Sequence, residues 1–251
     1  MQKKFKIENR RGLRINGLID WNGEDQGHLV ILCHGLFGFV EKPIIKETTK
    51  ALVKAGYTVV RFDATNNVGK SQGKFENFTV GGYIQDTKQV LSYALKDLNK
   101  NEYSIIGFSI GAMPSYIIGA SDKRMKQMVL QGPTYDLKYE LERKKSFLQL
   151  KEKGWAYEYS TGLKKNIKLG FGLYKEGVKY SVDKYLKKVT CPVLIIYGSG
   201  ERTGSIKTFI KLYNKISSKK KRIVIPGAPH TMKSKKDINQ FTKKVVLWLK
   251  K

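Results

Sequence analysis

The sequence predicts an α/β protein with a mostly parallel, eight-stranded sheet and helices on both of its faces. Short apolar runs rich in β-branched residues alternate with longer segments that have helical periodicity, which is the pattern of such a sheet. The chain has 251 residues, enough to bury a large core, and α/β proteins of this length commonly fold as one domain. We therefore expect residues 1–251 to form a single domain.

Eight segments have the composition and length of strands. The first two are joined by a short turn and should pair as an antiparallel hairpin, whereas helices separate the later ones, which should run parallel. In chain order, the expected strands are residues 5–9, 13–20, 28–34, 57–63, 103–108, 126–132, 192–198 and 222–227.

Three long helices are expected at residues 42–55, 77–98 and 234–249. In the last two of these segments apolar residues recur three and four positions apart, so each helix has one continuous apolar stripe. We assign both stripes to the core rather than to a functional site.

Residues 135–188 interrupt this alternation and are too long for a connection within the sheet. Alternating apolar and polar residues on both sides of a polar turn predict a β-hairpin in the middle of the segment. We expect the segment to be an inserted lid, with Trp155, Tyr157 and Tyr159 as candidates to line a substrate site. A packing role for each of these aromatic side chains is the alternative.

The formal net charge of +27 raises the question of a nucleic-acid partner, because basic surfaces attract phosphate. The 48 basic residues are mostly lysines, however, and they are spread along the chain rather than interleaved with stacking aromatic residues. The densest cluster, residues 217–222, comes just before the last expected strand, at the end of the sheet opposite the carboxyl ends of the strands. We therefore expect a solvated lysine-rich surface and no nucleic-acid partner.

No apolar run approaches the roughly 20 residues of a membrane span, and no apolar region follows the basic N-terminus as in a signal peptide. We expect a cytoplasmic protein without stable membrane insertion, and a homodimer stays open as an alternative to a monomer. Cys33 and Cys191 each lie in an apolar segment, where we expect reduced, buried thiols and no disulfide.

The stretch IIGFSIGAM, residues 105–113, places Ser109 between two glycines directly after an apolar strand. A sharp turn from a strand into a helix exposes the side chain at its apex and crowds the positions two residues before and after it. Gly107 and Gly111 would supply the room, and the N-terminus of a helix would lie directly behind the serine. We infer that Ser109 is a nucleophile.

A serine nucleophile needs a histidine base, which in turn needs an acidic partner. Of the three histidines, His230 lies in the loop between the last strand and the last helix, and we choose it as the base. Glu201 follows the preceding strand and is the expected acid, with Asp136 in reserve. The alternative for Glu201 is a surface ion pair with Arg202.

Backbone amides should stabilise the oxyanion that forms during acyl transfer. The amide of Ile110 follows the nucleophile, and the segment HGLFG after the third strand offers the amide of Leu36. Within that segment we give His34 and Gly35 supporting roles, with His34 bracing the loop. No group of residues has the spacing of a metal or phosphate site, so we expect no metal and no cofactor.

With these residues in place, the chain resembles the α/β-hydrolase family, and within it the compact serine esterases with an inserted lid that include cinnamoyl and feruloyl esterases. The resemblance implies the α/β-hydrolase fold and the roles given above for Ser109, His230, Glu201, Leu36 and Ile110. The chain departs from the family by its glutamate in place of the commoner aspartate, and by one more residue and two asparagines in the loop after the fourth strand. The motifs that carry the resemblance are IENRRGLRINGLI, HGLFG, GYTVVRFDATNNVGKSQG, GFSIG, CPVLIIYGSGE and PGAPH, in this order.

The expected function is that of a serine carboxylesterase, which cleaves small to medium acyl esters through an acyl-enzyme on Ser109. An acyl thioesterase and a monoacylglycerol lipase are alternatives that use the same chemistry. A non-catalytic protein that binds through its basic surface is the alternative from a different class.

Overall fold

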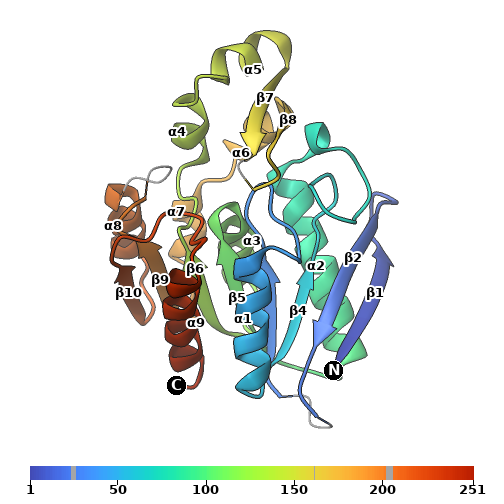
Figure 1. The fold of residues 1–251 in the computed structure, drawn as a ribbon, viewed down its shortest axis with the longest axis vertical. Coiled ribbons are helices and arrows are strands. Elements are labelled where there is room, and N and C mark those ends of the chain that lie inside the picture. The colour runs from blue at the N-terminus through green and yellow to red at the C-terminus, as the bar shows by residue number, and fades with distance from the viewer. Residues whose placement is uncertain (24–26, 161, 202–205) are drawn as a thin grey trace.

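The structure is a computed structural model and describes residues 1–23, 27–160, 162–201 and 206–251. Its centre is an eight-stranded sheet with the order β1-β2-β4-β3-β5-β6-β9-β10 (Figure 1). Pairs β1–β2 and β2–β4 are antiparallel and all other neighbours in this sheet are parallel. This confirms the predicted fold class. The strands are β1 (Gln2–Glu8), β2 (Arg14–Asp20), β3 (Leu29–Cys33), β4 (Thr58–Phe62), β5 (Tyr103–Phe108), β6 (Met125–Gln131), β9 (Val193–Gly198) and β10 (Lys220–Ile225).

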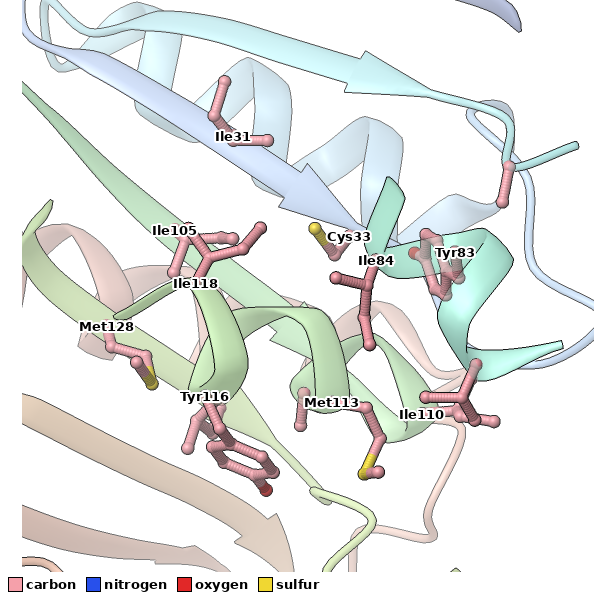
Figure 2. Close-up of a cluster of buried hydrophobic side chains, with 14 of the residues drawn as sticks. Ile31, Cys33, Tyr83, Ile84, Ile105, Ile110, Met113, Tyr116, Ile118 and Met128 are labelled. Carbon is pink, nitrogen blue, oxygen red and sulfur yellow. The ribbon is translucent and has the colours of Figure 1, made fainter. Parts of the chain in front are cut away.

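Helices cover both faces of this sheet. Side chains of α1 (Pro43–Lys54) and α9 (Lys235–Leu249) pack on one face, and those of α2 (Val80–Asp97), α3 (Ala112–Gly119) and α8 (Ile206–Lys215) on the other. Successive residues of a strand point to opposite faces, so a strand that is buried on both faces is apolar throughout. In β3, for example, Val30 and Leu32 join the cluster with α1, whereas Ile31 and Cys33 join the cluster with α2 and α3 (Figure 2).

The three predicted long helices are confirmed as α1, α2 and α9, and the apolar stripes of α2 and α9 are buried as expected. Thr79 caps α2 by accepting a hydrogen bond from the amide of Gly82, and Ser234 caps α9 by accepting one from the amide of Asp237. Pro114 fits within the first turn of α3, because an amide there needs no partner within the helix.

The segment between β6 and β9 forms a group of short elements beyond the carboxyl ends of the parallel strands (Figure 1). Its β7 and β8 pair in antiparallel fashion and form a separate two-stranded sheet, which confirms the predicted hairpin. The elements are α4 (Leu137–Glu142), α5 (Phe147–Lys153), β7 (Trp155–Ser160), β8 (Lys165–Gly170), α6 (Gly172–Gly177) and α7 (Val182–Leu186). Two short 3-10 helices, η1 (Phe75–Asn77) and η2 (Ser109–Gly111), complete the described structure.

Both cysteines are buried and free, as expected. Burial raises the pKa of the Cys33 thiol to about 12, so it does not ionise near neutral pH. The basic cluster of residues 217–222 leads into β10 at the amino end of the parallel strands, away from the segment between β6 and β9. None of the described helices combines the length and apolarity that crossing a membrane requires.

Candidate active site

Ser109 lies at the turn between β5 and α3. Its φ of 52° is in the left-handed region that residues other than glycine rarely adopt. It is the first residue of η2, and α3 begins directly after that turn. The amide of Thr134 donates a hydrogen bond to the carbonyl of Ser109 at 3.1 Å, which connects the turn to the loop after β6.

Close backbone contacts explain the glycines around Ser109. A Cβ at Gly107 would lie 2.6 Å from the carbonyl oxygen of Gly111, and a Cβ at Gly111 would overlap the carbonyl of Cys33. The loop after β3 also comes close, since a Cβ at Gly35 would lie 3.3 Å from the Cβ of Ser109. Larger residues at Gly107 and Gly111 would therefore push the turn out of position.

His230 lies after β10, and Glu201 lies after β9. Nδ1 of His230 is 2.7 Å from Oε2 of Glu201, whose side chain is fully buried. Burial lowers the pKa of His230, but the hydrogen bond and charge of Glu201, together with the charge of Glu140, outweigh burial and raise the pKa above its ordinary value. When Nδ1 donates to Glu201, Nε2 carries the lone pair that can accept a proton.

Hydrogen bonds hold these two loops to each other and to β6. The amide of Gly200 donates to the carbonyl of Ala228 at 3.0 Å, and Nε2 of Gln131, at the end of β6, donates to the carbonyl of His230 at 2.9 Å. Met232, two residues after His230, is fully buried in the core cluster that includes side chains of α1 and α9. The orientation of His230 is thus set by β6, β9 and β10 together.

The loop after β3 is braced by His34. Nδ1 of His34 donates to the carbonyl of Gly35 at 2.9 Å, and Nε2 accepts from the amide of Ala64 at 3.0 Å. Burial lowers the pKa of His34, so the ring stays neutral in this position. Within the described part of the chain, no hydrogen bond uses the amide of Leu36, which leaves it available as a donor. The side chain of Ile110 packs in the core (Figure 2), so only its backbone is free to serve the site.

The loop after β4, residues 63–73, differs from the family pattern but is tied to the loop after β3. Asp63 accepts hydrogen bonds from the amide of Val40 at 2.8 Å and from the amide of Lys70 at 2.7 Å. Asn66 takes a left-handed φ of 57°, and its side chain accepts a hydrogen bond from the amide of Lys74 at 3.1 Å. The contact of Asn66 therefore helps to close the loop after β4, and Asp63 ties this loop to the one that contains Leu36 through the amide of Val40.

Ser109 and His230 line one cavity of about 540 Å³. Its walls come from the loops after β3 and β10, the start of α1, and the end of β7 with the turn that follows it. The lining residues are His34–Phe39, Lys42–Ile45, Phe108, Ser109, Gln131, Tyr159, Ser160, Gly162 and His230–Lys233.

The remaining candidates occupy different places. Asp136 is exposed and caps α4 by accepting a hydrogen bond from the amide of Tyr139, whereas the carboxylate bonded to His230 is that of Glu201. Tyr159 lines the cavity, whereas Tyr157 lines a shallower groove beside η1. The ring of Trp155 packs edge-on against the ring of Tyr157, with 5.5 Å between the ring centres. Arg202, the alternative partner of Glu201, lies outside the described residues.

Sequence reasoning missed three residues of this site. Glu140 of α4 accepts a hydrogen bond from the hydroxyl of Thr134 at 3.1 Å, and burial raises its pKa to about 7. Gly132 has a φ of 48°, and a Cβ there would lie 2.9 Å from Nδ1 of His230. Lys42 lines the cavity at the start of α1. The Gly-Pro pair after β6 is a turn signal that points to Gly132, but nothing local marks the other two.

The cavity brings together the groups that acyl transfer to a serine requires. It contains a hydroxyl on a strained turn, an imidazole oriented by a buried carboxylate, and an amide donor from a neighbouring loop. Among the described residues, no three or more His, Cys, Asp and Glu side chains are grouped so that they could hold a metal ion.

A family model described as serine aminopeptidase, S33, matches residues 24–169, more than half of the chain. No curated protein sequence matches the chain.

Solved structures resemble the whole chain. Est1E from Butyrivibrio proteoclasticus, with ferulic acid bound, has a TM-score of 0.86 and 21% identity, covering 98% of this chain and 97% of that one. A putative hydrolase from Agrobacterium vitis S4 has a TM-score of 0.81 and 17% identity, with 98% of both chains covered. The esterase Pf2001 from Pyrococcus furiosus has a TM-score of 0.76 and 20% identity, covering 100% of this chain and 92% of that one.

Proposed function

The chain belongs to the serine aminopeptidase S33 family and has the α/β-hydrolase fold, and on this premise we propose that it is a serine carboxylesterase for small to medium acyl esters. The observation that carries the proposal is the hydrogen bond of 2.7 Å between His230 and Glu201, in a cavity that also contains Ser109 on a strained turn. The similar solved structures include proteins described as esterases, which supports this choice of reaction.

In the proposed mechanism, Oγ of Ser109 attacks the ester carbonyl while Nε2 of His230 accepts its proton. Glu201 keeps the imidazole in the tautomer that can accept this proton, and stabilises the imidazolium that results. The amides of Leu36 and Ile110 donate hydrogen bonds to the oxyanion. The imidazolium then protonates the departing alcohol, and a water molecule, deprotonated by His230, hydrolyses the acyl-enzyme and restores the serine.

The lining of the cavity favours an ester over the peptide substrate that the family description suggests. An aminopeptidase must hold the positive amino terminus of its substrate, which calls for an acidic partner. Among the described residues that line the cavity none is Asp or Glu, whereas Lys42 and Lys233 both contribute to it. A substrate ammonium group would therefore meet charges of its own sign.

We also propose that residues 135–188 act as the lid of a single domain. The end of β7 supplies Tyr159 and Ser160 to the cavity wall, the turn after it supplies Gly162, and α4 supplies the buried Glu140 beside the histidine. A lid that contributes to the wall would restrict which acyl or alcohol groups can enter. Of the three aromatic residues singled out in the sequence, Tyr159 is the one we assign to substrate contact.

Labelling with a fluorophosphonate probe, with the modified peptide identified by mass spectrometry, tests the proposed function. We expect one adduct per chain, on Ser109, and none in Ser109→Ala, which should also lose nearly all turnover, by up to about a million-fold. A folded protein that forms no adduct would instead favour the binding-protein alternative. If the adduct forms, matched oxygen esters, thioesters and monoacylglycerols then separate the carboxylesterase from its two acyl-transfer alternatives.

A further inference from the structure

Lys42 is a cation placed in the wall of the active-site cavity. It immediately precedes α1 and lines the same cavity as Ser109 and His230. Its ammonium group lies 5.2 Å from the centre of the Phe39 ring, and a side chain at Gly162, in the turn of the β7–β8 hairpin, would overlap that ammonium. Lys42 therefore reaches from the body of the fold to the proposed lid.

The surroundings of Lys42 combine partial burial with an unpaired charge, as far as the described residues go. Its side chain is partly buried, and no ion pair among these residues joins it to Asp or Glu, whereas Lys46 and Lys50 of α1 pair with Glu41 and Glu47. Burial lowers the pKa of Lys42, and the nearby charge of Lys233, another residue of the cavity wall, lowers it further. An anion bound beside Lys42 would stabilise its charged form against both of these effects.

The rest of the wall indicates what else the ligand must contain. Leu36, Phe37, Ile44 and Phe108 give the cavity apolar surface beside Ser109 and Lys42 in its lining. A ligand that fits both features has an apolar segment and one anionic oxygen group.

Building on the proposed function, we propose that the substrate is an ester that carries a carboxylate or a phosphate, and that Lys42 binds this anionic group. The contact is a charge-assisted hydrogen bond in a partly desolvated site, which discriminates strongly against a neutral ester of the same shape. The positive charge of the whole protein could also favour anions without any specific site. The test must therefore separate Lys42 from the general charge.

Matched ester pairs measure the preference. The p-nitrophenyl ester of valerate and the p-nitrophenyl monoester of glutarate differ only in a terminal methyl group that becomes a carboxylate. Para-acetoxybenzamide and para-acetoxybenzoate differ by a neutral carboxamide and a carboxylate on the leaving group, so the two pairs show which side of the ester carries the anion. We expect kcat/KM to favour the charged member of one pair by about 10-fold or more.

Substitutions of Lys42 test whether this residue causes the preference for the charged ester. Lys42→Gln should lower the ratio of charged to neutral kcat/KM by about 10-fold, and Lys42→Arg should restore most of it. Lys54→Gln is the matched control, because it removes the same charge from an exposed position at the other end of α1. An equal loss in Lys42→Gln and Lys54→Gln, or no preference in either pair, would overturn the proposal.

Protection of Ser109 from the neutral fluorophosphonate probe gives a second readout that does not depend on turnover. Glutarate and inorganic phosphate, tested separately, distinguish the two kinds of anion, and we expect one of them to slow labelling of the wild-type protein but not of Lys42→Gln. Labelling that neither anion slows would contradict the inferred site. Absence of labelling in every condition would instead contradict the proposed function, so the two failures are distinguishable.

Discussion

The contact between His230 and Glu201 determines what the imidazole can do. Nδ1 is committed to a buried carboxylate, so Nε2 is the nitrogen that can exchange a proton with Ser109. Glutamate has one more methylene group than the aspartate usual in the family, and the loop after β9 places its carboxylate within 2.7 Å of the ring. The longer side chain therefore supports the same contact.

Replacing the acid tests its assignment. We expect Glu201→Gln to lower kcat by about 1,000- to 10,000-fold, because an amide does not hold the required tautomer or stabilise the imidazolium. Asp136→Asn is the control, since Asp136 is exposed and caps α4. Steady-state kinetics on a neutral ester measures both, and a large loss in Asp136→Asn with little in Glu201→Gln would transfer the acid role.

The pH profile tests the second carboxylate near the histidine. His230 must be neutral to act as a base, so its raised pKa moves the acid limb of kcat/KM above the ordinary imidazole value. The pKa of Glu140, raised by burial to about 7, falls in the same range, so its charge appears as the pH rises and favours protonated His230.

We therefore expect Glu140→Gln to move the acid limb to lower pH, with the plateau at high pH largely kept. Kinetics of a neutral ester between about pH 5 and pH 9 measures this shift, and Glu142→Gln, an exposed position in the same helix, is the control. A limb that stays in place or moves to higher pH would exclude an electrostatic effect of Glu140 on the base.

The sequence allows a prediction of those site residues whose positions are set locally. Ser109, Glu201 and His230 each follow a recognisable strand, and the carboxyl ends of parallel strands meet at one edge of the sheet. Lys42 and Glu140 could not be found in this way. Their places at the site depend on how α1 and the segment between β6 and β9 pack over that edge, which no local pattern encodes.

At the level of elements, the turn that contains Ser109 lies between β5 and α3, two elements whose side chains pack in the core. β5 is buried on both faces, and α3 packs its side chains into the same cluster, as Figure 2 shows for Ile105, Met113 and Tyr116. The turn between them is held from both sides, so the unusual φ of Ser109 is imposed by its surroundings.

This predicts a large effect from a single methyl group. Gly111→Ala places a Cβ against the carbonyl of Cys33, so we expect a loss of roughly 1–3 kcal/mol in the free energy of unfolding and strongly reduced labelling of Ser109. Gly172→Ala is the control, because its Cβ would make only an ordinary contact 3.5 Å from Thr79. Urea unfolding measures the stabilities, and equal behaviour of the two variants would contradict a crowded turn.

The elements differed in how well they could be predicted. The strands and the long helices have enough residues to show their periodicity, and all eight strands of the main sheet were found. Helices α4, α5, α6 and α7 have five to seven residues, so none spans more than about two turns. Helices this short depend on tertiary contacts rather than on propensity, which explains why their sequence carries little signal.

For the whole molecule, the net charge of +27 and the position of the site act together. The densest basic cluster lies at the amino end of the parallel strands, whereas the cavity opens at their carboxyl end. Lysines are distributed over the rest of the surface, so the protein as a whole presents a positive potential to an approaching anion. Both this broad field and the local contact with Lys42 would raise the affinity of the site for an anionic ester.

The two contributions respond differently to salt. The Debye length falls from about 30 Å at 10 mM salt to about 10 Å at 100 mM, so the broad field is screened first, and the partly buried contact is screened less. We therefore expect kcat/KM for the anionic ester to decrease as salt rises and then to level off above the value for Lys42→Gln, with little change for the neutral ester. The double variant Lys219→Gln/Lys221→Gln, at the opposite end of the sheet, should keep this plateau. If kcat/KM did not change with salt for either ester, the general surface charge would have no role in binding the substrate. If the anionic ester reached the same plateau in the wild-type protein and in Lys42→Gln, the preference would come from the general field alone and not from Lys42.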